Sequence, residues 1–223
     1  MKGRIFLNTG LFPNGHALTK FDWTARLIPG AGLFFDFDIQ SEAYCSDYDG
    51  NFEDEDHLLW ESKGMWANSG ACWISSTDEW ETGFLVGNSV EPFTFERLGN
   101  ASYCPDPLEG YWENEDRSFA AYILDHDFVC GHTIEFEKQE SGLYAINWTG
   151  KVALSNEGDF EFKYNFLVKA SEVKFDGVRF PARMTLDEAR EELNRYVVNI
   201  DEFTVKNYQA DTRYFPEPRF VPL

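Results

Sequence analysis

The residues best equipped for chemistry lie in an acidic stretch at positions 46–57, SDYDGNFEDEDH. Its carboxylates alternate along the chain, as the ligands of a calcium loop do. An EF-hand loop counted from Asp47 needs glycine at its sixth position and glutamate at its twelfth, but Gly50 falls fourth and Leu58 falls twelfth. The EF-hand interpretation therefore fails. A solvated acidic loop, a partner-binding surface and a weak divalent-cation site remain open for this stretch.

A second group of reactive side chains occupies positions 125–132, DHDFVCGH. His126, Cys130 and His132 are ligand types that zinc accepts, with water in a fourth place. By strand parity the three share one face, provided that the strand is uninterrupted. Their spacing matches no standard zinc motif. We therefore expect no bound metal and no cofactor here, and interpret the stretch as two strands joined by a turn, with a buried thiol.

Tryptophans recur beside the acidic stretch. Trp60, Trp66, Trp73 and Trp80 follow one another at intervals of six or seven residues, and Trp112 comes later. Glycines and serines interrupt any helical stripe, so core packing is the default interpretation. Exposed rings beside carboxylates would instead suit a sugar, or the Lys and Arg side chains of a protein.

The charge of the chain restricts its partners. The formal net charge is −20, from 19 Lys and Arg against 39 Asp and Glu. Within residues 41–116 there are 18 acids and two basic residues, a balance of −16, so the other residues carry only −4. A nucleic-acid backbone must be met by Lys and Arg, so we expect no nucleic-acid partner.

Motifs of the common enzyme classes are missing. The sequence has no GxSxG, HExxH or P-loop, and no GxGxxG between a strand and a helix. We therefore expect a non-enzymatic acidic protein that binds a basic partner, as inhibitors and immunity-type proteins of nucleases do. The alternative is a β-barrel or sandwich that binds a small ligand such as a carbohydrate. Hydrolysis by a carboxylate pair stays open in that case.

The partner-binding residues follow from the acidic stretch, while no catalytic residue is identified. They are Asp47, Asp49, Glu53, Asp54, Glu55, Asp56 and Trp60. No apolar run approaches the ~18 residues of a membrane span, so we expect no membrane partner. The four cysteines are scattered and the N-terminus lacks an export signal, so we expect reduced thiols and a cytoplasmic location.

Two segments of the sequence are similar to each other. FDWTARL at residues 21–27 resembles INWTGKV at residues 146–152, and a gapless alignment also matches Phe35 with Phe160 and Phe37 with Phe162. Each copy alternates apolar and polar residues around a turn, as in a β-hairpin. The echo suggests an internal duplication, with Trp23 and Trp148 in equivalent buried places.

The overall pattern predicts one compact, mainly β unit over residues 1–223, an antiparallel sandwich or barrel. Its possible pseudo-repeat halves are an acidic, Trp-rich segment at 1–116 and a segment at 117–223. One helix is expected over about 185–198, because Thr185 and Glu188 form a capping box before an apolar stripe. The stripe should place Leu186, Leu193 and Val197 against a sheet. A final strand at 200–205 and an extended proline-rich tail complete the expectation.

Overall fold

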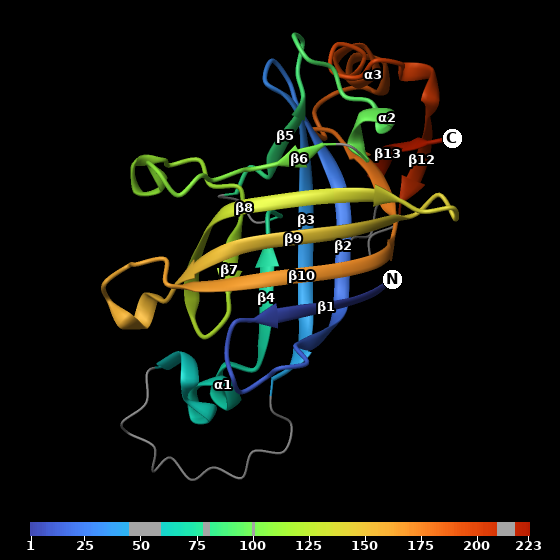
Figure 1. The fold of residues 1–223 in the computed structure, drawn as a ribbon. Helices are drawn as coiled ribbons and strands as arrows, with labels where there is room; N and C mark the ends of the chain where they lie inside the picture. Colours follow the sequence, from blue (N-terminus) through green and yellow to red (C-terminus); the bar gives the residue numbers. More distant parts are fainter. Residues whose placement is uncertain (45–58, 78–80, 100, 209–216) are drawn as a thin grey trace.

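The computed structural model describes residues 1–44, 59–77, 81–99, 101–208 and 217–223, and eight antiparallel strands among them close into a β-barrel (Figure 1). The mainly β class is confirmed, and the form is a barrel. The barrel strands are β1 (Lys2–Leu7), β2 (His16–Ile28), β3 (Gly32–Ala43), β4 (Ala71–Ser75), β7 (Ala120–Tyr122), β8 (His126–Lys138), β9 (Tyr144–Ala153) and β10 (Tyr164–Val173). Neighbours around the ring follow chain order, and β1 closes it by pairing with both β2 and β10.

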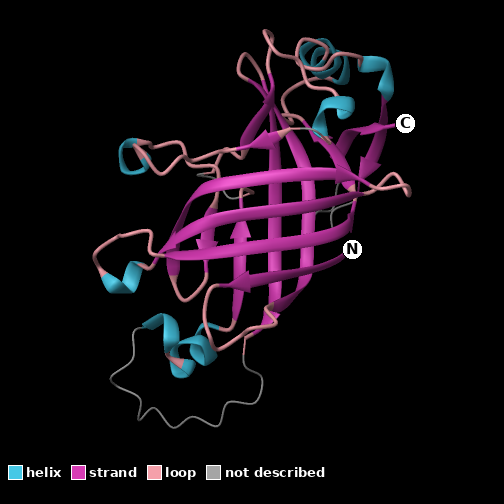
Figure 2. Cartoon of the chain, in the orientation of Figure 1, coloured by secondary structure: helices cyan, strands magenta, loops and turns pink. Residues whose placement is uncertain are grey.

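The remaining elements extend the barrel wall or cap its ends (Figure 2). The extra strands are β5 (Phe84–Gly87) on β3, β6 (Ser102–Tyr103) on β8, β11 (Phe175–Arg179) parallel to β2, β12 (Phe203–Tyr208) and β13 (Glu217–Pro222). The α-helices are α1 (Lys63–Ser69), α2 (Phe95–Leu98) and α3 (Leu186–Leu193). The 3-10 turns are η1 (Leu59–Glu61), η2 (Tyr111–Glu113), η3 (Ser155–Glu157) and η4 (Ile200–Glu202). The expected extended tail thus contains a paired strand, β13.

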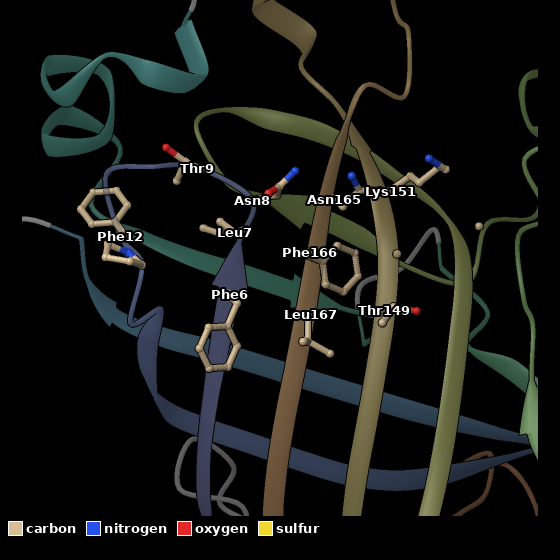
Figure 3. Close-up of a pocket in the computed structure, with 13 residues that line it drawn as sticks. Phe6, Leu7, Asn8, Thr9, Phe12, Thr149, Lys151, Asn165, Phe166 and Leu167 are labelled. Carbon is tan, nitrogen blue, oxygen red and sulfur yellow. The ribbon is translucent and has the colours of Figure 1, made fainter.

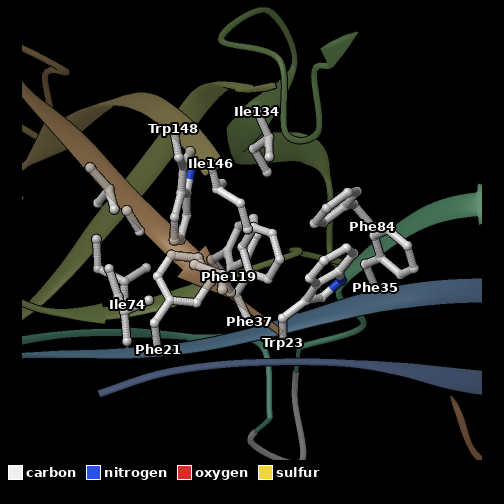
Figure 4. Packing of buried hydrophobic residues seen from close by; sticks show 14 of the residues in the cluster. Phe21, Trp23, Phe35, Phe37, Ile74, Phe84, Phe119, Ile134, Ile146 and Trp148 are labelled. Atoms are coloured by element: carbon white, nitrogen blue, oxygen red, sulfur yellow. The ribbon is translucent and has the colours of Figure 1, made fainter. Parts of the chain in front are cut away.

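Aromatic side chains fill the inside of the barrel. Trp23, Phe35, Phe37 and Trp148 are each 0 % exposed, and their rings meet one another and Phe136 at centroid distances of 5.0 to 6.0 Å (Figure 4). An eight-stranded barrel is just wide enough for side chains to fill. The interior of this barrel is therefore a packed core that holds the wall in shape.

The two echoed tryptophans occupy comparable places. Trp23 lies in the first strand of the β2–β3 hairpin and Trp148 in the first strand of the β9–β10 hairpin, and both are buried. Each faces inward by the alternation of its strand. The first strands therefore correspond as the sequence alignment requires.

The second strands of the two hairpins do not correspond. Phe35 and Phe37 lie in β3 and are buried, whereas Phe160 and Phe162 precede β10, which begins at Tyr164. The β9–β10 turn is longer than the β2–β3 turn, so the pairing register differs between the hairpins. Residues 160–163, which the alignment matches with strand residues 35–38 of β3, therefore lie outside a strand, and β10 begins only at Tyr164. An internal duplication stays a prediction.

The capping box of the C-terminal helix is confirmed. Thr185 accepts a hydrogen bond from the Glu188 backbone, and the Glu188 side chain accepts one from the backbone of Thr185. The helix is shorter than expected, because α3 ends at Leu193 and turns follow it. Leu193 and Val197 are buried, but Leu186 is 43 % exposed. The expectation that Leu186 packs on a sheet is wrong, because Leu186 is the first residue of α3 and remains exposed, while Ala189 and Leu193 are the buried residues of the helix.

Candidate interaction site

Most of the partner-binding residues expected from the sequence fall outside the described residues. Asp47, Asp49, Glu53, Asp54, Glu55 and Asp56 all lie there. Trp60, the remaining one, is 1 % exposed. Its indole Nε1 donates a hydrogen bond of 2.7 Å to the backbone oxygen of Asn8, and its ring stacks on Tyr164 at 4.4 Å. Trp60 is therefore part of the core, as the default interpretation of the tryptophans expects.

The three candidate zinc ligands do not converge on a common site in the described part of the chain. His126 is exposed at the start of β8, while Cys130 and His132 are buried. The pairing of β8 with β9 is irregular between Cys130 and Thr133, where Gly131 has a φ of +58°. A bulge of this kind breaks the strand parity on which a shared face depends. His132 consequently faces the barrel interior, where its ring contacts Trp148. The described residues contain no group of three or more His, Cys, Asp or Glu placed to hold a metal ion.

Five aromatic rings gather on the outside of the barrel wall, and we call them the aromatic cluster. Its members are Tyr111, Trp112, Phe128, Phe160 and Phe162, whose rings meet at centroid distances of 5.0 to 5.8 Å. They come from η2, from the wall strand β8 and from the β9–β10 turn. The loop with η2 and the β9–β10 turn extend from the same side of the barrel (Figure 1). Trp112 is 44 % exposed and Phe160 is 45 % exposed. Large rings exposed together on a surface are typical of interaction sites.

A cation already lies against three rings of the cluster. The guanidinium carbon of Arg117 lies 4.9 Å from the ring centroid of Tyr111, 5.7 Å from that of Trp112 and 5.2 Å from that of Phe128. A guanidinium over an aromatic face is attracted by the negative ring quadrupole. The arrangement shows that these rings accept an arginine side chain.

The segment that carries Trp112 and Arg117 is anchored by Asp106. Asp106 is 6 % exposed, and its carboxylate accepts hydrogen bonds from the backbone nitrogen of Ser118 at 2.9 Å and from the Ser118 hydroxyl at 3.0 Å. The Asp106 backbone oxygen accepts a third, from Gly131 on β8 at 2.6 Å. Burial raises the pKa of the Asp106 carboxyl, while the bonds from Ser118 oppose that rise. The anchored segment fixes η2 against the wall of the barrel.

The turn that carries Phe160 is braced by its own polar side chains. Lys163 donates to Glu157 at 3.2 Å and also to Asp159, whose carboxylate accepts a hydrogen bond from the Glu161 backbone at 3.0 Å. Phe160 itself has a φ of +55°. This left-handed conformation is unfavourable for a bulky residue. The turn therefore holds a strained phenylalanine on the surface.

Carboxylates border the aromatic cluster on both of its loops. Those exposed are Glu109, Glu113, Glu115, Asp116, Asp159 and Glu161. The two basic residues of these loops are already engaged, Arg117 over the rings and Lys163 with Glu157 and Asp159. The cluster therefore combines apolar contact area with a negative border, which suits a basic protein.

The buried carboxylates have structural partners. Asp36 is 0 % exposed and is paired with Arg26 and Arg179, each at 2.7 Å. The carboxylate of Asp127 accepts hydrogen bonds from the backbone nitrogens of Leu124, Asp125 and Ser155. These bonds tie strand ends and the extra strand β11 to the barrel.

Ser118, Asp106 and His132 resemble the residues of a catalytic triad only in type. The Ser118 hydroxyl donates to Asp106, and His132 is 1 % exposed. The imidazole Nδ1 of His132 accepts from the indole Nε1 of Trp148 at 3.2 Å. A base must reach the proton of its nucleophile. His132 is instead a buried core residue that packs against aromatic rings.

A separate groove of about 640 Å³ runs along the outer wall near the ends of β1, β9 and β10 (Figure 3). Phe6, Phe12 and Leu167 give it an apolar floor, and Asn165 and Lys151 add polar groups. A concave site with a few polar groups is typical of small-molecule sites. The groove is therefore the place where the alternative function would reside.

Comparisons with known proteins give no relative from which to transfer a function. No family model, curated protein or solved structure matches this chain. Among the described residues, no helix is both long enough and apolar enough to cross a membrane.

The aromatic cluster was only partly visible in the sequence. Trp112 stands out within the acidic region, but Phe160 and Phe162 resemble alternate residues of a strand. The signal that separates them is Gly158-Asp159, a turn pair directly before Phe160. Gly158 has a φ of +73° and ends η3, so the chain turns there.

Proposed function

We propose that this chain is a non-enzymatic acidic binding protein that engages a basic protein, in the manner of an inhibitor or immunity-type protein of a nuclease. The observation that carries the proposal is the exposed aromatic cluster with carboxylates along its border. The packed barrel serves as the scaffold that presents it. The proposal includes a cytoplasmic location, where the described cysteines, Cys72, Cys104 and Cys130, remain as free thiols.

Rings and carboxylates contribute to binding in different ways. Buried aromatic anchors supply most of the affinity of a protein interface, and Trp112 and Phe160 present the exposed ring area for such contacts. Carboxylates at a border steer an approaching cation and raise the association rate, and salt screens their effect. A partner that carries positive charge for its own nucleic acid would complement both features.

The test uses capture of proteins from an extract of the native host, at low and at high salt. Glu113, Glu115, Asp116 and Glu161 are changed together to their amides in the test variant. A matched control variant changes four exposed carboxylates away from the cluster, which are Glu135, Glu137, Glu140 and Asp187. We expect wild type and control to retain a protein rich in Lys and Arg at low salt. The test variant should bind it with a slower association rate. Capture that is insensitive to salt, or equal for all three proteins, would contradict the proposal.

The groove favours a second candidate function, the binding of a small neutral ligand such as a carbohydrate. Its ring faces and its Asn and Thr side chains are groups that contact sugars. Binding in this groove should depend little on salt, since no ion pair with the ligand is required. Titration with a panel of mono- and oligosaccharides at low and high salt therefore separates the two candidates.

A further inference from the structure

We propose that the outer side of the aromatic cluster receives an arginine side chain of the partner, and that Phe160 is held on the surface for this purpose. This inference rests on the proposed function and specifies the chemistry of its site. The receiving surface is formed by the exposed rings of Trp112 and Phe160, with Phe162 beside them.

The first observation is that the cluster already binds one guanidinium. Arg117 lies against the rings of Tyr111, Trp112 and Phe128. Trp112 stays 44 % exposed, although the ring of Phe162 stacks on it at a centroid distance of 5.5 Å and an interplanar angle of 27°. A planar guanidinium stacks on an aromatic face, whereas an ammonium group is compact and strongly hydrated. The rings therefore favour arginine over lysine.

The second observation is the backbone of Phe160. A φ of +55° is unfavourable for phenylalanine and would suit glycine at this turn. The ring gains contacts with Trp112 at 5.7 Å and Phe128 at 5.8 Å, yet 45 % of the residue stays exposed. Strained residues with exposed side chains tend to mark functional sites. Contact with a partner accounts for a phenylalanine at this position.

The third observation is the charge around the rings. Glu113, Asp116 and Glu161 are exposed near the cluster. A carboxylate next to an aromatic face supports a guanidinium through bidentate hydrogen bonds while the ring stacks on its plane. The same carboxylates repel phosphate groups, so an anionic lipid surface or a nucleic acid is disfavoured as the occupant.

The test compares hexa-arginine and hexalysine peptides by calorimetric titration at low salt. The two peptides have equal charge, so a difference between them reports on the guanidinium group. We expect wild type to bind hexa-arginine about two- to fivefold more tightly than hexalysine for each ring contact formed. Phe160→Gly removes one receiving ring and relieves the strained backbone, so the preference should fall by the about two- to fivefold that one ring contributes, while the unfolding midpoint changes little.

Two further variants complete the test. Glu172 also has a positive φ, of +57°, and lies on β10 away from the cluster, so Glu172→Gly is the control for relief of backbone strain and should keep the preference. Phe160→Leu keeps apolar volume without a π face, and it should show the same reduced preference even if the glycine variant unfolds. Equal binding of both peptides by wild type, or an unchanged preference in Phe160→Leu, would overturn the arginine site. The proposed function would survive either result if a basic partner is still captured in a salt-dependent way, and it fails independently if none is.

Discussion

The buried histidine His132 provides a quantitative test of the packing described above. It lies inside the barrel, where its Nδ1 accepts a hydrogen bond from Trp148 and its ring contacts Phe119 at 4.9 Å. Within the described part of the chain, its Nε2 has no hydrogen-bond partner, and the nearest charged atom recorded for it is an Asp106 oxygen at 3.8 Å. Burial lowers the pKa of His132 from 6.5 to about 3. Burial disfavours the charged imidazolium, so the folded protein keeps this ring neutral.

The direction in which His132 changes the stability with pH follows from proton linkage. Below pH 6.5 the unfolded chain binds a proton at His132 that the folded protein does not bind. The free energy of unfolding therefore falls as the pH drops from 6.5 towards 3. The slope for one proton is about 1.4 kcal/mol per pH unit, so the whole interval amounts to roughly 5 kcal/mol as an upper bound. The nearby Asp106 acts in the opposite direction, because its pKa is raised.

The assay is urea unfolding of wild type and His132→Gln between about pH 7 and pH 4. Replacement by Gln removes the titrating group and leaves Asp106 in both proteins, so the difference between the two stability curves isolates His132 to a first approximation. Wild type should lose stability relative to the variant by about 1.4 kcal/mol for each pH unit below 6.5. Parallel curves, or a histidine signal that titrates near pH 6 in the folded protein by NMR, would refute the reasoning.

Three further predictions concern folding and are each checked by chemical denaturation. Asp36→Ala leaves two partly buried guanidinium groups without their carboxylate, and should destabilise the protein by about 3 kcal/mol; a loss below 1 kcal/mol would show that solvent replaces the pair. Gly150→Ala should cost about 1–3 kcal/mol, since the added Cβ would lie 2.5 Å from the Phe166 ring; an unchanged midpoint would mean that the ring can move away. Thr185→Ala removes the cap of α3 and should cost about 1 kcal/mol, with Thr185→Ser retaining most of the stability.

Local features were determined by the sequence alone. The Thr185 and Glu188 capping box forms as expected, because both groups lie within one helical turn and need no distant partner. The alternation of apolar residues likewise identified the β class, since strand geometry places every second side chain on one face. Regional acidity and the absence of enzyme motifs were also evident, and from them the proposed class of partner follows.

The tertiary structure decided which of two residues of the same type is buried in the core and which lies on the surface. Phe37 and Phe162 align in sequence, yet Phe37 is buried in the barrel and Phe162 joins a cluster on its outer wall. The difference arises from the lengths of two turns, which set the pairing register of each hairpin. In the same way, the irregularity near Gly131 places His132 inside the barrel, on the opposite face of β8 from the one that simple alternation from His126 predicts.

The aromatic cluster could not have been assembled from the sequence. Trp112, Phe128 and Phe160 are far apart along the chain, and they meet only because the barrel closes and places η2 beside the β9–β10 turn. Closure depends on long-range pairing, in particular that of β1 with β10. Sequence patterns report the contacts of neighbours in the chain, whereas a surface site on a barrel depends on which strands become neighbours in space.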